Sequence, residues 1–322
     1  MTDDPDSPGD GPTVAVVVAT NRRSPYLAQA LTSLAAQTHD RWELVIADNG
    51  VPDPQWLDDV VERTVGKADV VRVPPSATVS ESRNTGVAHT VGELVVFLDD
   101  DDVWHPERLA RQVLALAADP AAPASYCGGW HLDAHGARVG PAWPATPATA
   151  DDMLARRARL PHICGALMVR RADLLAVGGF SPEMSMLEDM ELALRLLRRG
   201  TFACVPDELV GYRRHDGNAT RSDVANQRRR RDVADAVLSR QAWAARDRGD
   251  RRAADLLAEH LATERREAAR EAGRTMLWAL AHGHVGVAAG EAAWGLRHDA
   301  RGFVGGLRGR LRRRVLDALG RG

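Results

Sequence analysis

The sequence predicts an α/β protein: a mostly parallel sheet flanked by helices and followed by a C-terminal helical region. Short apolar runs alternate with helical segments over residues 14–98, and this alternation is typical of parallel sheets with right-handed crossovers. Polar residues follow several of these runs, and four consecutive aspartates, residues 99–102, follow one of them. After about residue 222 the chain is mainly Ala, Arg, Glu and Leu, a composition that favours helices.

Each element near the N-terminus has its own local signal. Residues 14–19 (VAVVVA) form a continuous apolar run, which indicates a buried strand. Ser24 and Pro25 predict the start of a helix, with the serine as N-cap and the proline at the first helical position. We also expect strands at 43–47, 69–73 and 93–98, and a helix at 80–90.

The elements beyond residue 103 are less regular. Residues 104–118 predict a helix, and residues 120–150, rich in Ala, Pro and Gly, predict an irregular connection. A strand at 163–169 is followed by a short helix at 171–177, which ends at two glycines. We expect a helix at 188–199 and short strands at 201–205 and 209–212.

Composition narrows the class of protein. The 322 residues carry a net charge of −2, so no overall field favours nucleic acid. The three cysteines lie far apart, which predicts neither a disulfide framework nor a zinc cluster and fits a reducing cytoplasm. Residues 1–12 predict a disordered leader that is not a signal peptide. We expect an α/β domain at 13–222, a helical region at 223–322, and no membrane-spanning segment.

The polar residues that end the predicted strands define a candidate site. Thr20 and Asn21 follow the first strand, Asp48 follows the second, and the four aspartates follow the fourth. Because the carboxyl ends of parallel strands share one edge of a sheet, these groups should converge at a ligand crevice. Four neighbouring carboxylates repel one another unless a cation is held there. A hard divalent cation, with a ligand phosphate completing its shell, meets that need.

Several of these residues have two alternative roles. Asp48 either accepts hydrogen bonds from a base or ribose, or forms an Asx-turn with the following Asn-Gly. Arg83 either contacts a base or phosphate or is a solvated helix arginine. Asp99 and Asp101 point the same way if the backbone stays extended, while Asp102 is placed to cap the next helix.

Two candidates lie later in the chain. Glu188 and Asp189 begin a helix, and the helix dipole stabilises carboxylates there. That environment is expected to keep Asp189 ionised near neutral pH, as a general base must be. His215 follows the last predicted strand and is either a metal ligand, a phosphate contact, or neither.

Seven sequence blocks, in one order, carry a family resemblance. Over roughly residues 14–222 the chain resembles family 2 glycosyltransferases with the GT-A fold. The blocks are VVVATNR (16–22), LTSLAAQT (31–38) with WE (42–43), IADNG (46–50), SRNTG (82–86), FLDDDDVWHP (97–106), GGF (178–180), and ED (188–189) through Arg195 with YR (212–213).

The resemblance implies an inverting transfer of a sugar from a nucleotide-diphospho-sugar to an acceptor hydroxyl. It implies Mg²⁺ or Mn²⁺, with a carbohydrate, lipid-linked or small-molecule acceptor in cell-envelope or polysaccharide biosynthesis. Asp189 would be the catalytic base, and Asp101 with His215 would hold the metal or diphosphate. The residues implied in nucleotide-sugar binding are Thr20, Asn21, Asp48, Arg83, Asp99 and Asp100.

The chain departs from the family pattern at three places. Ala19 replaces the usual proline, Asn49 replaces the usual second aspartate, and Asp100 stands between the two acids of the DxD pair. The third departure leaves open which acid binds the metal.

Three rival functions remain. A sugar nucleotidyltransferase would show a glycine-rich loop after strand one, and residues 20–24 contain no glycine. A retaining transferase differs in the product anomer. A non-catalytic sugar-nucleotide-binding or scaffold protein would consume no sugar nucleotide.

The C-terminus contains a basic amphipathic pattern. Leu307, Leu311, Val315 and Leu319 recur at helical spacing beside several arginines. Such a helix either rests on the anionic inner face of a membrane or packs on the catalytic domain with its basic face in solvent. The chain is expected to be cytoplasmic, with peripheral membrane contact as the alternative.

Overall fold

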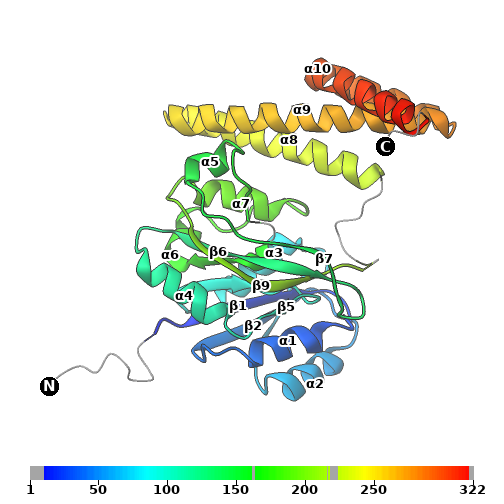
Figure 1. Cartoon of the computed structure of the whole chain (residues 1–322). Coiled ribbons are helices and arrows are strands. Elements are labelled where there is room, and N and C mark those ends of the chain that lie inside the picture. The colour runs from blue at the N-terminus through cyan, green and yellow to red at the C-terminus, as the bar shows by residue number, and fades with distance from the viewer. Residues whose placement is uncertain (1–10, 162–163, 216, 218–223, 319–322) are drawn as a thin grey trace. The chain divides into compact units, whose positions relative to one another are not determined.

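The computed structural model describes residues 11–161, 164–215, 217 and 224–318, the last ten of these by their backbone alone (Figure 1). Contacts within the chain divide it into two units. An α/β unit comprises Met1–Met153 and Arg157–Arg221, and a helical unit comprises Leu154–Arg156 and Ser222–Gly322.

The α/β unit is built on one mixed sheet, in which the described residues form nine strands. Six run in one direction: β1 (Val14–Thr20), β2 (Trp42–Asp48), β3 (Asp69–Arg72), β4 (Leu94–Phe97), β6 (Ala124–Leu132) and β9 (Ala203–Arg213). The other three are β5 (Val103–Trp104), β7 (Arg138–Trp143) and β8 (Leu167–Arg170). The spatial order is β3-β2-β1-β4-β8-β6-β9-β5, with β7 beside β6. The α/β class and the mostly parallel sheet are confirmed.

Helices cover both faces of the sheet (Figure 1). On one face, β1 buries Val14, Val16 and Val18 against α1 (Leu27–Ala35), α2 (Pro54–Thr64) and α4 (Arg108–Ala118). On the other face α3 (Val79–Ala88) lies so close to β1 that a Cβ on Gly86 would come within 2.4 Å of Val17. Short helices α5 (Ala150–Leu154), α6 (Arg171–Ala176) and α7 (Glu188–Leu196), and the 3₁₀ turn η1 (Cys164–Ala166), complete the α/β elements.

The prediction of an irregular connection at 120–150 is wrong, because this segment contains β6 and β7. β6 is almost entirely buried, yet five of its nine residues are small, among them Gly128 and Gly129. A Cβ at Gly129 would lie 2.2 Å from the carbonyl oxygen of Val210, and one at Gly128 would lie 2.7 Å from that of Trp143. Close approach of the neighbouring strands therefore requires the glycines, which lower the local strand propensity.

Other element boundaries differ from the prediction. Ser24 is not the cap of α1, which begins at Leu27 after Tyr26; the Ser24 hydroxyl instead donates to the Asp100 carbonyl at 2.9 Å. Trp104 belongs to β5, and the helix predicted from it begins at Arg108. The two short strands expected at 201–205 and 209–212 form the single strand β9.

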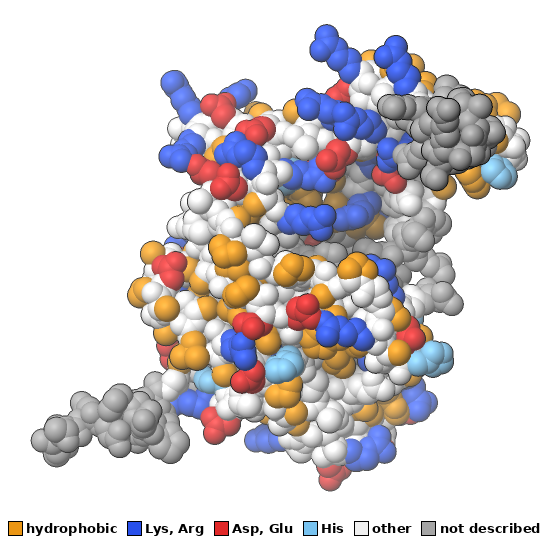
Figure 2. Space-filling view, viewed as in Figure 1, with side chains coloured by type: hydrophobic (Ala, Val, Ile, Leu, Met, Phe, Trp, Pro, Cys, Tyr) orange, Lys and Arg blue, Asp and Glu red, His pale blue; other side chains and the backbone are white. Residues whose placement is uncertain are grey.

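The helical unit contains α8 (Val224–Asp247), α9 (Arg251–Ala281) and α10 (Val285–Ala318). Within it, Glu291 is buried and accepts hydrogen bonds from Arg228 and Arg231. Basic side chains, with acidic ones among them, are prominent on its visible surface (Figure 2). Among the described helices, none combines the length and the hydrophobicity that a membrane span requires.

The basic amphipathic pattern at the C-terminus lies partly within α10. Leu307 packs against the small apolar cluster of Ala269, Ala272 and Phe303 in the helical unit. Leu319 and the side chains of Leu311 and Val315 lie outside the described residues. Packing of at least the first apolar position therefore occurs between helices of this unit.

Candidate active site

The four aspartates, residues 99–102, lie in a tight turn between β4 and β5, at the carboxyl edge of the parallel strands. We call this turn the acid turn. The Asp102 amide donates to the Asp99 carbonyl at 3.2 Å, which closes the turn. The backbone is therefore not extended, and Asp99 and Asp101 do not project together by strand alternation. Each carboxylate instead has its own set of partners, although Asp100 and Asp101 share Arg22.

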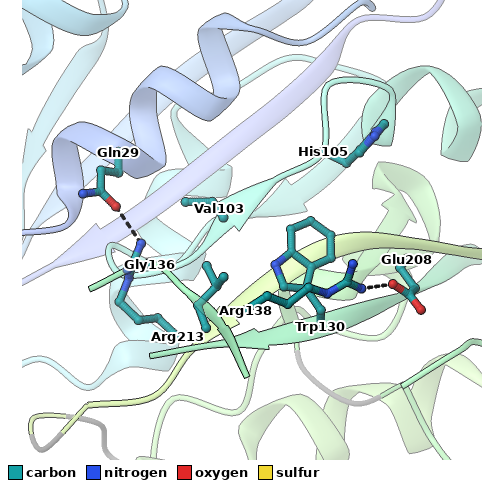
Figure 3. A pocket seen from close by; sticks show the side chains of 9 residues that line it. Gln29, Val103, His105, Trp130, Gly136, Arg138, Glu208 and Arg213 are labelled. Atoms are coloured by element: carbon teal, nitrogen blue, oxygen red, sulfur yellow. Dashed lines mark hydrogen bonds and ion pairs between the residues drawn. The ribbon is translucent and has the colours of Figure 1, made fainter. Parts of the chain in front are cut away.

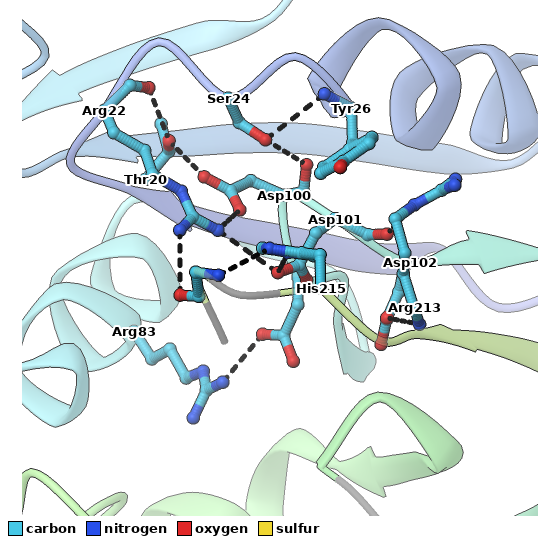
Figure 4. Close-up of polar contacts among 12 residues, drawn as sticks. Thr20, Arg22, Ser24, Tyr26, Arg83, Asp100, Asp101, Asp102, Arg213 and His215 are labelled. Atoms are coloured by element: carbon cyan, nitrogen blue, oxygen red, sulfur yellow. Dashed lines mark hydrogen bonds and ion pairs between the residues drawn. The ribbon is translucent and has the colours of Figure 1, made fainter. Parts of the chain in front are cut away.

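Asp100 faces the end of β1 (Figure 4). Its carboxylate accepts hydrogen bonds from the Thr20 hydroxyl at 2.7 Å and from the Arg22 guanidinium at 3.0 Å. The Ser24 hydroxyl holds its carbonyl oxygen. Asn21 lies in the exposed turn between Thr20 and Arg22. Thus the segment after β1 is hydrogen-bonded to one side of the acid turn.

Asp101 lies between a cation and an imidazole. Its Oδ2 is 3.1 Å from Nη2 of Arg22 and 3.0 Å from Nε2 of His215. The Gly217 amide donates to Nδ1 of His215 at 3.0 Å, so a neutral ring carries its proton on Nε2 and donates to Asp101. Burial, together with repulsion from Asp99 and Asp100, raises the pKa of Asp101, while His215 and Arg22 oppose the rise.

The prediction that Asp102 caps the next helix is wrong. Asp102 instead joins the turn to β9. Its Oδ1 accepts a hydrogen bond from the Arg213 amide at 3.0 Å, and Nε of Arg213 donates to the Asp101 carbonyl at 2.8 Å. Both side chains are buried. Burial and the negative charges of Asp99 and Asp101 raise the pKa of Asp102 well above its ordinary value.

Arg83 is a buried bridge between two segments. Its guanidinium donates to Asp99 at the end of β4 and to Glu188 at the start of α7, both at 2.8 Å, and lies 5.3 Å from the ring centre of Phe180. The reading as a solvated helix arginine is excluded, because only 5% of the residue is exposed.

Asp189 lies in the first turn of α7, directly after Glu188. The preceding Leu187 has a left-handed backbone with φ of 59°, a conformation that costs free energy in a residue with a Cβ. Burial, followed by repulsion from Glu188, raises the pKa of Asp189 to about 6. The expected stabilisation by the helix dipole is therefore outweighed, although Asp189 is still mostly ionised at neutral pH.

Asp48 ends β2 and lies at the same sheet edge, where it forms the Asx-turn. Its Oδ1 accepts hydrogen bonds from the amides of Gly50 at 3.1 Å and Val51 at 2.7 Å. Arg72 donates to the other carboxylate oxygen. The Asp48 side chain is buried, so a nucleotide could contact its carboxylate only by displacing Arg72.

The sequence predicts no site role for Arg22, Arg213 or Glu188. Arg22 and Arg213 bind the acid turn, and Glu188 binds Arg83. Charge balance is the sequence signal that could have identified the two arginines. Four buried or half-buried acids need compensating cations, and Arg22 and Arg213 are arginines that follow the ends of predicted strands.

A divalent metal fits this turn only as part of a complex with a ligand. Among the residues that the structure describes, no group of three or more His, Cys, Asp or Glu side chains is positioned to hold a metal. Asp101 and His215 supply one carboxylate and one imidazole. Mg²⁺ sites commonly use one or two carboxylates with water and substrate phosphates, so the donor set suits Mg²⁺ or Mn²⁺ bound together with a diphosphate.

Solved structures share this architecture. TarS of S. aureus, residues 1–349 in complex with UDP-GlcNAc, aligns with a TM-score of 0.54 and 18% identity, covering 70% of this chain and 66% of that one. A second structure of the same fragment gives a TM-score of 0.54, 17% identity, and coverage of 77% and 70%. Fold and site together define a GT-A-like α/β protein.

The model of glycosyl transferase family 2 matches residues 14–178. The chain belongs to this family. An uncharacterised glycosyltransferase of Haemophilus influenzae is 25% identical over 198 residues, 59% of this chain and 63% of that protein. The amylovoran biosynthesis glycosyltransferase AmsE of Erwinia amylovora is 26% identical over 213 residues, 65% and 76% of the two chains. This chain thus spans less than two thirds of the Haemophilus relative.

Replacing Arg83 with Met should destabilise the α/β unit by about 3 kcal/mol, because Asp99 and Glu188 would be left together without their cation. The control is Arg111→Met, since Arg111 also bridges two carboxylates, Glu107 and Asp207, but on the surface. That change should cost less than about 1 kcal/mol. Urea unfolding measures both, and equal losses for the two variants would contradict the structural role of Arg83.

Proposed function

We propose that this chain is an inverting, metal-dependent glycosyltransferase that moves a sugar from a nucleotide-diphospho-sugar to an acceptor hydroxyl. One observation carries the proposal: Arg83 joins the acid turn to the start of α7 and so brings a carboxylate of raised pKa, Asp189, close to the candidate diphosphate site. Family membership supports the reaction class. TarS, which shares the fold, was solved with UDP-GlcNAc and with UDP.

The acid turn and the end of β1 would bind the donor. In this proposal Asp48 and Arg83 lie toward the base and Asp99 toward the ribose, while Thr20, Asn21 and Asp100 line the nucleotide-sugar site. Asp101 and His215 would hold Mg²⁺ or Mn²⁺, which when bound offsets the negative charge of a departing diphosphate. Arg22 adds a permanent positive charge beside Asp100 and Asp101.

Asp189 would act as the general base. Its pKa of about 6 leaves it ionised at neutral pH and basic enough to accept a proton from a hydroxyl as that oxygen attacks the anomeric carbon. The attack breaks the bond to the diphosphate in one displacement, so the configuration inverts. Because AmsE is named for amylovoran biosynthesis, we further propose a saccharide chain under construction as the acceptor, with the reaction in the cytoplasm.

Replacing Asp189 with Asn should lower the transfer rate by about 10² to 10⁴, because the proton acceptor is lost. Donor binding should stay within about twofold. The variant Asp58→Asn, on the exposed face of α2, is the control and should be fully active. Transfer and donor binding are measured separately, by product formation and by calorimetry. Loss of both in Asp189→Asn would mean that Asp189 is not simply the base.

The rate of transfer should fall as the pH drops through about 6, because the raised pKa of Asp189 makes the carboxylate the minor form below that value. Each further unit of pH should cost about tenfold in rate. Glu188→Gln removes the adjacent negative charge and should move this acid limb to lower pH. A wild-type limb centred near the ordinary value of about 4 would contradict the assignment.

Asp101→Asn should abolish the dependence of nucleotide binding on metal, because the carboxylate that holds the ion is lost. Thermal unfolding of wild type and variant is followed with UDP, GDP, ADP, CDP and dTDP, each with and without Mn²⁺. A ligand present at about 100 times its dissociation constant stabilises the folded state by about 2.7 kcal/mol. An identical response to Mn²⁺ in wild type and variant would remove Asp101 from the metal role.

A further inference from the structure

A cavity of about 650 Å³ opens on the α1 side of the sheet (Figure 3). It lies between α1 and the ends of strands β5, β6 and β9, with β7 at its rim. Its polar and aromatic lining comes from Gln29, His105, Trp130, Arg138, Glu208 and Arg213. Its volume lies within the range of about 300–1,000 Å³ that is usual for small-molecule sites.

This cavity and the candidate base, Asp189, lie on different faces of the sheet. Successive residues of a strand point to opposite faces, so Trp130 and Leu132 face the cavity and His131 faces away. The start of α7, with Asp189, contacts α3 through Arg83, on the face opposite α1 (Figure 1).

Arg213 is the link between the two places. Its amide and Nε bind Asp102 and the Asp101 carbonyl, while Nη2 donates to Gln29 at 2.7 Å at the wall of the cavity (Figure 3). An occupant that contacts Gln29 would therefore lie one side chain away from the acid turn.

The indole of Trp130 is built into the wall of the cavity. It lies against Gly211 of β9, where a Cβ would approach the ring to 2.9 Å. The guanidinium of Arg138 lies 5.1 Å from the indole centre and pairs with Glu208. These two charged side chains are 54% and 39% exposed, so their pairing contributes only about 0–1 kcal/mol. A ligand can therefore replace one partner of this ion pair at little cost in free energy.

The chemistry of the lining favours a saccharide. A sugar ring has an apolar C–H face and a rim of hydroxyls, and the cavity offers an indole surrounded by an amide, a guanidinium, a carboxylate and an imidazole. Charge is balanced: Glu208 neutralises Arg138, and Arg213 is committed to the acid turn. A phosphate or other anion that paired with Arg138 would be repelled by the neighbouring Glu208 carboxylate, whereas an uncharged sugar would not.

We propose that this cavity binds sugar residues of the acceptor or product chain, apart from the donor site. The choice of ligand class rests on the proposed function. Holding the chain close to the acid turn raises the effective concentration of its growing end at the reaction site. The cavity would then select for long acceptors over short ones.

The test is binding of the full chain, without donor, to an array of short oligosaccharides of glucose, galactose, mannose, rhamnose and N-acetylglucosamine. Wild type should bind at least one of them. Trp130→Ala should weaken that binding about tenfold or more. The double variant Arg138→Ala, Glu208→Ala alters only half-exposed groups and should also weaken it, which covers the case in which Trp130→Ala fails to fold. Trp243→Ala removes an indole that is 69% exposed in the helical unit and should change nothing.

Variants of the candidate active site separate this proposal from the proposed function. Asp189→Asn and Asp101→Asn should keep oligosaccharide binding in full, whatever they do to transfer or to nucleotide binding. If binding persists in them and falls in the Trp130 or Arg138 and Glu208 variants, the cavity is the site even when no transfer is found. The proposal is overturned if wild type binds no oligosaccharide on the array. It is also overturned if the cavity variants bind as wild type does, or if only the Asp189 and Asp101 variants lose binding.

Discussion

The buried guanidinium of Arg83 is the interaction on which the candidate active site depends. It holds Asp99 and Glu188, which come from segments far apart in the sequence, at 2.8 Å each. A buried cation requires its carboxylates as much as they require it, so the acid turn and the start of α7 are positioned together. Burial, followed by the negative charge of Glu188, raises the pKa of Asp189, while Arg83 itself lowers it. The ion-pair bridge thus sets the position of the candidate base, and burial makes the largest contribution to its basicity.

No two carboxylates of the acid turn accept hydrogen bonds from the same set of donors, and these donors offset part of the mutual repulsion. Asp99 takes Arg83, Asp100 takes Thr20 and Arg22, Asp101 takes Arg22 and His215, and Asp102 takes the Arg213 amide. The turn separates side chains that an extended backbone would have stacked on two faces. In the proposed function, Asp101 would exchange its partners, a histidine and a half-exposed arginine, for a metal ion.

The two faces of the sheet carry different features. The face covered by α3 and α7 holds Arg83, Glu188 and Asp189, while the face covered by α1 opens into the cavity beside Trp130. Arg213, buried at the end of β9, touches both the acid turn and the cavity wall. The small residues of β6 make this arrangement possible, because Gly128 and Gly129 let β7 and β9 approach closely.

Local patterns were enough to predict the first four strands, the polar residues at their carboxyl ends, and the family, because apolar runs, turn residues and motif order are local properties. Contacts across the fold were needed to show which partner each aspartate takes, that β6 is a central strand, and that Ser24 binds Asp100 and does not cap α1. The physical reason is the same in each case. These outcomes depend on contacts between segments far apart in the chain, where close packing and charge pairing outweigh local propensity.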